Sequence, residues 1–315
     1  MKKTHPHTIL LASAIGAASF ANASNTLING DLGTGTNWDT GAPTTVGNIG
    51  IIDGDNTGAN AGILTSTNGL FIQQTGGEVN GSGIGQTFDS TLYQLIDGDF
   101  GVNGLSVTNG SAFSVSGGTA DFGSSGNTRN LGIVTLGTVD VSGGVVNVSL
   151  DLTLNSTGSA TDKVYNFSGG TIDIARHALS GFQCNGTANF SGSVSFTVGN
   201  TLGTNQAGVR LVNIGAGTGS ITTATLEARG MSIDWTSGSG FSLTTNSLLS
   251  SNAATTWQNL WTAGQLTIDG GNVGTFGDHF QVVDNTLSLV PEPSSFALLG
   301  LGMSPLVFIR RRRHT

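Results

Sequence analysis

The chain has 315 residues, of which 50 are glycine and only 10% are charged, and its formal net charge is −8. All nineteen acidic residues lie within 24–292, where only five basic residues occur, so this segment carries a net charge of −14. Nucleic acids and anionic membranes are bound by clustered Lys and Arg, so the segment is not expected to bind either one. A single cysteine, Cys184, excludes an internal disulfide and is predicted to be a buried thiol.

The N-terminus is typical of a secretory signal peptide. Lys2 and Lys3 precede an apolar segment over 9–20, which leads into Ala21-Asn22-Ala23. A basic start, a short apolar stretch and an Ala-x-Ala site predict cleavage by signal peptidase after Ala23, with Ala21 and Ala23 as the recognised residues. Residues 1–23 are therefore predicted to be removed when the chain is exported across the inner membrane.

Residues 24–62 are rich in Asn, Gly, Thr and Asp and contain one large apolar side chain, Trp38. Ile49, Ile51 and Ile52 predict a first strand. This opening resembles the N-terminal coils of autotransporter-passenger and adhesin-like β-solenoids, which implies that Trp38 closes the end of a core. A tryptophan that stacks on a sugar is the functional alternative.

Two acidic segments could be calcium loops. They are Asp53-Gly54-Asp55-Asn56 and Asp97-Gly98-Asp99, in which paired carboxylates flank a tight turn. Neither continues into the spaced ligands of an EF-hand or of a calcium-binding β-roll. Asp-Gly is also the usual dipeptide of turns between strands, so both segments are predicted to be turns.

The central part contains a repeated Ser-Gly-Gly. Copies begin at Ser116, Ser142 and Ser168, which are equally spaced, and a degenerate Ser-Gly-Ser begins after a slightly shorter interval, at Ser191. Apolar and polar residues alternate on both sides of each copy, which predicts a strand, a sharp bend and another strand. Glycine permits a positive φ at such a bend. The predicted corner residues are Gly117, Gly118, Gly143, Gly144, Gly169 and Gly170.

A period in the twenties with strand alternation predicts an all-β fold, a right-handed parallel β-helix with one repeat per coil, over 24–205. Inward Val, Ile and Phe side chains would stack from coil to coil, and polar side chains would cover the outside. A sandwich of antiparallel hairpins is the alternative. Hairpins do not require near-equal spacing of an identical corner, so the β-helix is favoured.

Residues 206–290 are predicted to hold further strands and a cap. Strands are expected over 209–214, 220–226 and 264–269. Trp257, Leu260 and Trp261 would form one face of a short helix within 253–263, which would cover the open end of the solenoid. Residues 280–283 and 286–289 predict a hairpin around Asp284-Asn285. The two tryptophans are interpreted as cap core, with a carbohydrate platform as the alternative.

Catalytic motifs are scarce. The sequence contains no Gly-x-Ser-x-Gly, no His-x-x-x-His and no Gly-Lys-Ser/Thr, so neither a cofactor nor a metal is expected. The enzymatic alternative is a β-helix polysaccharide lyase or hydrolase that uses carboxylates and a basic residue on one face. Asp121 and Asp173 occupy equivalent positions two repeats apart, with Asn147 between them and Arg176 and Lys163 nearby. A solvated outer ladder explains the same residues, and we expect no enzyme.

The C-terminal segment, 291–315, has three parts in a fixed order: Pro291-Glu292-Pro293, an uncharged apolar run over 294–309, and Arg310, Arg311, Arg312 and Arg313. The apolar run is shorter than the roughly 20 residues of a spanning helix, and the arginines would hold its end on the cytoplasmic side. This order resembles the PEP-CTERM sorting signal of Gram-negative bacterial surface proteins. The alternatives are an ordinary membrane anchor and a buried hairpin followed by a solvated basic end.

The resemblance implies export, transient anchoring in the inner membrane and processing by an exosortase near the tripeptide. It also implies a bacterium that makes exopolysaccharide and a role at the cell surface or in the extracellular matrix. We therefore predict an exported, non-enzymatic, adhesin-like structural protein that contacts exopolysaccharide through many weak contacts. A carbohydrate-binding module without catalysis is a further alternative.

Overall fold

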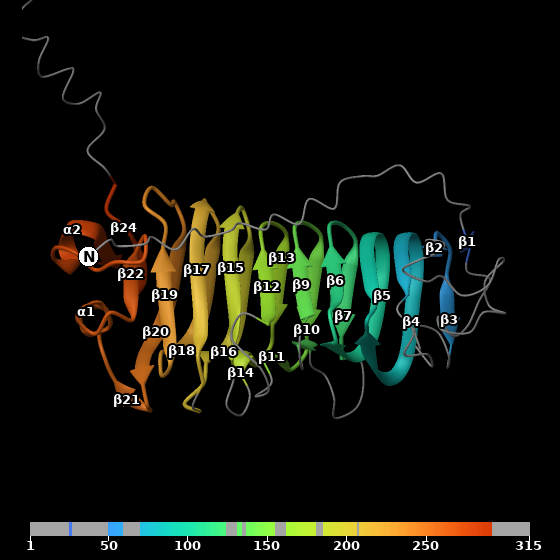
Figure 1. Ribbon diagram of the computed structural model, residues 1–315, viewed down its shortest axis with the longest axis horizontal. Coiled ribbons are helices and arrows are strands. Elements are labelled where there is room, and N and C mark those ends of the chain that lie inside the picture. Colours follow the sequence, from blue (N-terminus) through green and yellow to red (C-terminus); the bar gives the residue numbers. More distant parts are fainter. Residues whose placement is uncertain are drawn as a thin grey trace, which may run out of the picture.

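A computed structural model describes residues 25–26, 50–58, 70–123, 131–133, 137–154, 162–180, 185–206 and 208–291. Strands follow one another along a single axis and form an elongated stack, with α1 and α2 at the C-terminal end (Figure 1). Neighbouring coils pair in parallel, as Val139 does with Phe113 on one side and Tyr165 on the other. The predicted parallel β-solenoid is confirmed, and its right-handedness stays a prediction.

The stack has three sides, which we call sheets 1, 2 and 3. Long strands such as β4 (Phe71–Asp89) and β5 (Leu92–Thr108) bend at the corners and contribute to all three sheets. Sheet 1 also contains β1 (Asn25–Thr26), β2 (Gly50–Ile52), β6 (Ser111–Val115), β9 (Gly137–Val141), β12 (Lys163–Phe167), β15 (Gly186–Gly192), β17 (Arg210–Gly217), β19 (Met231–Trp235) and β22 (Leu266–Ile268).

Sheets 2 and 3 share the later strands β16 (Ser195–Gly203), β18 (Ser220–Glu227) and β20 (Ser242–Ser250), whose first halves lie in sheet 2 and whose second halves lie in sheet 3. Sheet 2 also contains β3 (Asn56–Gly58), β7 (Thr119–Phe122), β10 (Val145–Val148), β13 (Thr171–Ile174) and β24 (Thr286–Leu289). Sheet 3 also contains β8 (Leu131–Ile133), β11 (Asp151–Leu154), β14 (His177–Ser180) and β21 (Ala253–Ala254).

The core is a column of inward-facing apolar side chains. Every second residue of β6, β9 and β12 is buried, because side chains alternate between the two faces of a strand. Phe167 is 1% exposed, and its ring centroid lies 5.2 Å from that of Phe190 and 5.0 Å from that of Phe196. Aromatic rings thus pack between coils as well as across one coil, among the Val, Ile and Leu side chains of the core.

Glycines line the corner between sheets 1 and 2. The predicted corner glycines lie there, and the column extends further toward the N-terminus than the Ser-Gly-Gly repeat does. Gly170 has φ +79°, and a Cβ at this position would stand 2.6 Å from the carbonyl oxygen of Gly144. Backbones of successive coils therefore touch at this corner, where only glycine fits. The glycines in contact from coil to coil are Gly54, Gly77, Gly98, Gly118, Gly144 and Gly170.

The stack continues across residue 205, where the predicted solenoid domain ends. β17 pairs in parallel with β15, and β18 pairs in parallel with β16, in the same register as the earlier coils. Parallel pairing extends to β22, which follows β19 in sheet 1. The Ser-Gly-Gly signature fades before this point because the later corners use other residues, although the coils themselves persist.

A cap closes the C-terminal end. Helix α1 (Trp257–Thr262) buries Trp257, Leu260 and Trp261, the three residues predicted to face the core. The helix is shorter than 253–263 because Thr256 caps its N-terminus, accepting a 3.1 Å hydrogen bond from the Asn259 backbone N–H. A second helix, α2 (Phe276–His279), was not predicted, although Thr275 and Asp278 form a capping box.

The predicted hairpin consists of β23 (Phe280–Val283) and β24, paired antiparallel around Asp284 and Asn285. Both turn residues have positive φ, as a two-residue hairpin turn requires. β24 also pairs antiparallel with β20, so the hairpin covers the last edge of sheet 2. Among the described residues, no helix combines the length and apolar character needed to cross a bilayer.

Candidate binding surface

A continuous column of polar side chains runs along the outside of sheet 1. Asn166 donates a 2.6 Å hydrogen bond to Asp140 Oδ1, Asn189 donates one of 2.7 Å to Asn166 Oδ1, and Asn213 donates one of 2.7 Å to Asn189 Oδ1. The amides of Asn166 and Asn189 thus each donate to one neighbouring coil and accept from the other. The full column, joined by strand register, is Gln73, Gln94, Ser114, Asp140, Asn166, Asn189, Asn213, Asp234 and Thr267.

The column holds one perturbed carboxyl group. Burial raises the pKa of Asp140 above its ordinary value, and the hydrogen bond donated by Asn166 lowers it in part. The neutral form of this carboxyl is therefore favoured by folding.

A second column lies outside sheet 2 and changes character along the axis. Toward the N-terminal end it carries carboxylates and an amide, and Asn147 donates a 2.7 Å hydrogen bond to Asp121 Oδ1. Toward the cap it carries threonines, and the hydroxyls of Thr244 and Thr286 lie 2.9 Å apart. The column in order is Asp121, Asn147, Asp173, Thr197, Thr222, Thr244 and Thr286.

Serines form a parallel row beside these threonines. Ser195, Ser220 and Ser242 pair in register on β16, β18 and β20, and Ser288 continues the row on β24. Neighbouring strands are about 4.8 Å apart, so the cap half of sheet 2 presents a regular array of hydroxyls. The sequence signal for this array is the recurring Ser-x-Thr of the three strands, which the sequence analysis missed.

A cleft of about 350 Å³ adjoins the middle of the sheet 2 column. Its polar lining comes from Asn147, Asp173 and Thr197, one from each of three successive coils. The remaining lining residues are small or apolar: Val148, Ser149, Ile174, Ala175 and Gly199. Small side chains at the corner next to a row of hydrogen-bonding groups make a shallow site that can accept a polar chain lying across the strands.

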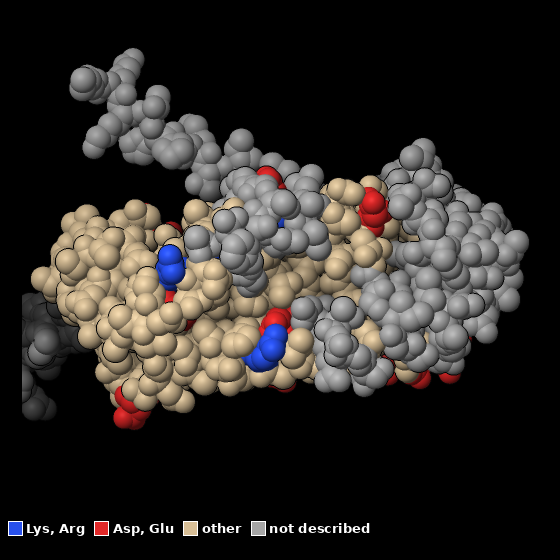
Figure 2. All heavy atoms as spheres, turned by 90° about the horizontal axis from the view of Figure 1, so that it is seen from below, with Lys and Arg blue, Asp and Glu red and all other residues tan. Residues whose placement is uncertain are grey.

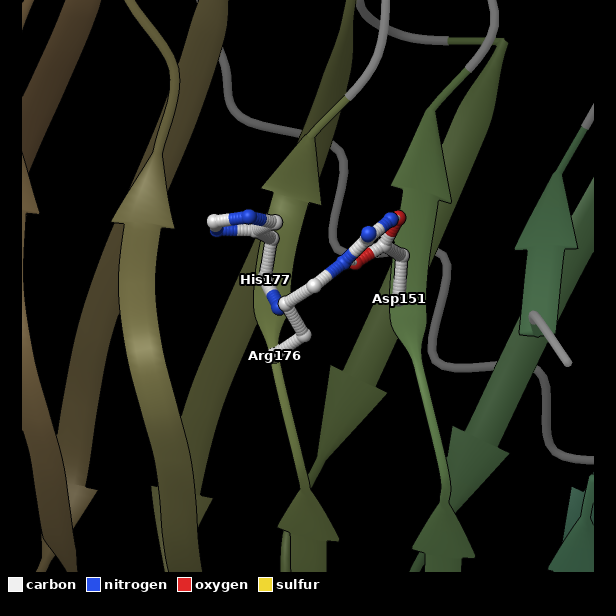
Figure 3. A network of polar contacts seen from close by, with 3 residues as sticks. All are labelled: Asp151, Arg176 and His177. Carbon is white, nitrogen blue, oxygen red and sulfur yellow. Dashed lines mark hydrogen bonds and ion pairs between the residues drawn. The ribbon is translucent and has the colours of Figure 1, made fainter.

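An ion pair joins two coils on sheet 3 (Figure 3). Arg176 Nε donates a 2.8 Å hydrogen bond to Asp151 Oδ1, and its Nη2 contacts the other carboxylate oxygen. The backbone N–H of His177 also donates to Asp151 Oδ1, at 3.2 Å, while its imidazole points away from the carboxylate. Pairing with Asp151 raises the pKa of Arg176. The fork-shaped contact ties β11 to the start of β14.

The residues of the enzymatic alternative do not come together as expected. Asp121 and Asp173 do share one column with Asn147 between them. Arg176 pairs with Asp151 on sheet 3, and Lys163 is buried at the start of β12 in sheet 1. The enzymatic alternative uses a basic residue on the same face as the carboxylates, and Lys163, on β12, belongs to a different side of the coil from Asp121 and Asp173.

The two acidic segments considered as calcium loops lie at the corner between sheets 1 and 2, where Asp53 to Asp55 form a bend between β2 and β3 and Asp97 to Asp99 belong to the bent strand β5. Asp97 accepts a 2.8 Å hydrogen bond from the Gly98 N–H, and Asp55 accepts one of 3.0 Å from the Glu78 N–H. The first bond is local to the corner, and the second joins two neighbouring coils. Within the described ranges, no group of three or more His, Cys, Asp or Glu is placed to hold a metal ion.

Several predicted residues lie outside the described ranges. They are the signal-cleavage residues Ala21 and Ala23, the anchor Trp38, the thiol Cys184, and the sorting residues Glu292, Pro293 and Arg310 to Arg313. Pro291 is described and is exposed, directly after the cap.

Comparison with known families identifies the C-terminal segment. Residues 289–313 match the family described as PEP-CTERM protein-sorting motif. The chain therefore carries the sorting signal of a PEP-CTERM exosortase substrate. The motif implies an exported, membrane-anchored precursor that an exosortase processes and that is sorted to the cell surface. Neither the curated proteins nor the solved structures contain a significant match to this chain.

Proposed function

We propose that the exported body is a non-enzymatic, adhesin-like structural protein of the bacterial surface or extracellular matrix, where it associates with exopolysaccharide. The observation that supports this proposal most directly is the Ser and Thr array on sheet 2, with the adjoining cleft. Hydroxyls at regular spacing can exchange hydrogen bonds with the hydroxyls of a sugar chain.

Binding of this kind is multivalent. Each exposed hydroxyl contributes little, since it exchanges a hydrogen bond to water for one to the sugar. Successive coils repeat the same contact at about 4.8 Å, which is close to the length of one sugar residue in an extended glycan. A chain lying along the axis would meet several coils at once, and its weak contacts would add through avidity.

The negative charge of the exported segment favours neutral over acidic polysaccharides as partners. The segment 24–292 carries a net charge of −14, which disfavours acidic polymers. On the face shown in Figure 2, the described part of the surface is mostly uncharged, with few Lys, Arg, Asp or Glu side chains. We therefore propose that the partner is a neutral, hydroxyl-rich polysaccharide.

A pair of matched variants tests the proposal. Thr197→Val with Thr222→Val removes two hydroxyls from sheet 2, and Thr201→Val with Thr225→Val removes two from sheet 3 of the same strands. The processed protein is passed over immobilised neutral dextran, acidic alginate and exopolysaccharide purified from the producing cells. We expect retention on a neutral polymer that the sheet 2 variant weakens severalfold and the sheet 3 variant does not. Equal retention of all three proteins, or no retention, would refute the proposal.

A polysaccharide lyase or hydrolase is the second candidate. It is favoured by the Asp121 and Asp173 column beside the 350 Å³ cleft. Two coils separate these carboxyl groups, about 9.6 Å at the spacing of adjacent strands, near the upper end of the separation in inverting glycosidases. Release of reducing ends or unsaturated products by the intact protein, abolished in Asp173→Asn, would establish it. Absence of turnover on the polymers that the protein retains would remove it.

A further inference from the structure

The sorting motif begins inside the folded cap. The matched segment starts at Leu289, the last residue of β24, which pairs with Phe280 and packs against the core. Val290 follows, and its backbone N–H donates a 2.8 Å hydrogen bond to the His279 carbonyl oxygen. Two residues of the motif thus belong to the folded body, and Pro291 is the next residue in the chain.

No spacer separates the cap from the Pro-Glu-Pro tripeptide. Three residues span at most about 11 Å even when fully extended. A specific protein interface covers about 800 Å² on each partner, far more than three residues can supply. An enzyme that engages the tripeptide of the folded protein is therefore brought within reach of the cap.

A cleft of about 600 Å³ lies at this junction. We call it the cap cleft. Its walls come from the β19–β20 connection, β22, α2 and the exit of β24, and they include Ser237, Ser239, Ile268, Asp278, Leu289 and Val290. The cleft is therefore continuous with the first residues of the sorting motif.

The walls of the cap cleft are held in place by hydrogen bonds. Ser239 Oγ donates to the Gly215 carbonyl at 2.8 Å, and the Ser237 N–H donates to Asp269 Oδ1 at 3.2 Å. Asp278 accepts a 2.9 Å bond from the Thr275 N–H. This bond, more than any other influence, lowers the pKa of Asp278.

We propose that the cap cleft is a docking surface for the exosortase, so that the enzyme recognises the folded cap together with the tripeptide. Ile268, Leu289 and Val290 offer apolar contact, and Asp278 offers an acceptor for a basic or polar side chain. A preformed cleft beside the scissile region would orient the enzyme before it reaches the tail. The inference rests on the sorting motif and is independent of polysaccharide binding.

A substitution and its matched control, both made in the full chain, test the docking surface. The rate of tail removal is measured by pulse-chase in cells with and without the exosortase. Ser237→Trp fills the cleft from an exposed position, and Gln258→Trp adds the same bulk on the exposed side of α1. We expect about tenfold slower processing of the first, the size of one lost hot-spot contact, and the wild-type rate for the second. Thermal unfolding of both variants checks that the cap is intact.

A spacer provides the second measurement and alters no folded residue. Gly-Ser-Gly-Ser is inserted between Val290 and Pro291, which moves the tripeptide away from the cleft. Docking predicts slower processing, with no further slowing when Ser237→Trp is added, because the two changes remove the same contact. Processing of Ser237→Trp at the wild-type rate would overturn the proposal. Faster processing after spacer insertion would overturn it too, because the folded cap would then obstruct the enzyme.

Discussion

The close contact between coils at the glycine corner predicts how much a glycine-to-alanine substitution lowers the free energy of unfolding. Gly170 and Gly110 have nearly the same φ, +79° and +80°. A Cβ on Gly170 would lie 2.6 Å from the Gly144 carbonyl oxygen and 2.8 Å from the Gly143 carbonyl carbon, whereas a Cβ on Gly110 would meet nothing within 4 Å. Both alanine variants therefore carry the cost of a positive φ, and only Gly170→Ala adds a close contact between coils.

The conformational cost is about 1 kcal/mol for a single residue of positive φ. Overpacking against backbone that cannot retreat adds about 1–3 kcal/mol. Gly170→Ala should thus lower the free energy of unfolding by about 2–4 kcal/mol, and Gly110→Ala by about 1 kcal/mol. Guanidinium denaturation of the processed protein, followed by circular dichroism, measures both.

The difference between the two variants tests whether close contact between coils constrains the glycine corner. Equal destabilisation, within about 0.5 kcal/mol, would show that backbone contact between coils does not constrain the corner. Destabilisation of Gly170→Ala alone by the larger amount would support close stacking of the glycine column.

Three further predictions concern the core and the outer ladder. Phe167→Asp should abolish the β-type circular dichroism spectrum, because an unpaired carboxylate would enter an aromatic core; retention of the full spectrum would contradict the core assignment. Asn189→Ala removes the donor to Asn166 and the acceptor for Asn213 and should cost about 1–2 kcal/mol in denaturant unfolding, whereas an unchanged midpoint would mean that water replaces both bonds. Folding raises the pKa of Asp140, so the protonated Asp140 carboxyl stabilises the fold below the ordinary aspartate pKa, and this stabilisation is lost as the pH rises through the raised pKa. Asp140→Asn, which stays neutral, should therefore unfold at a higher denaturant concentration than wild type at pH near 7 and show no such gain at pH near 3.

The sequence by itself was sufficient for the parallel coil and for the closure of its C-terminal end. Three identical corners at equal spacing, flanked by period-two alternation, predict one coil per repeat. The Trp257, Leu260 and Trp261 pattern and the Asp284-Asn285 turn predict the cap, because both signals are local and need no distant partner. The sorting signal is equally local, since its three parts are contiguous.

The corners outside the Ser-Gly-Gly copies were not identified from the sequence. Corners at Gly77 and Gly98 belong to the same column as Gly144, yet they lie closer together along the chain than the Ser-Gly-Gly copies do. A solenoid keeps the register of its stacked strands, and the connections between sheets can change length without disturbing it. A search for constant spacing therefore finds only the coils whose connections happen to be equally long.

Contacts between coils were decided only by the tertiary structure. Asn166, Asn189 and Asn213 could be predicted to lie outside, but their mutual hydrogen bonds depend on the register of three strands far apart in sequence. Lys163 and Asp173 are close along the chain, but the bend between β12 and β13 places them on different sheets. Alternation along one strand determines whether a side chain points inward or outward, whereas its neighbours are set by how successive coils stack.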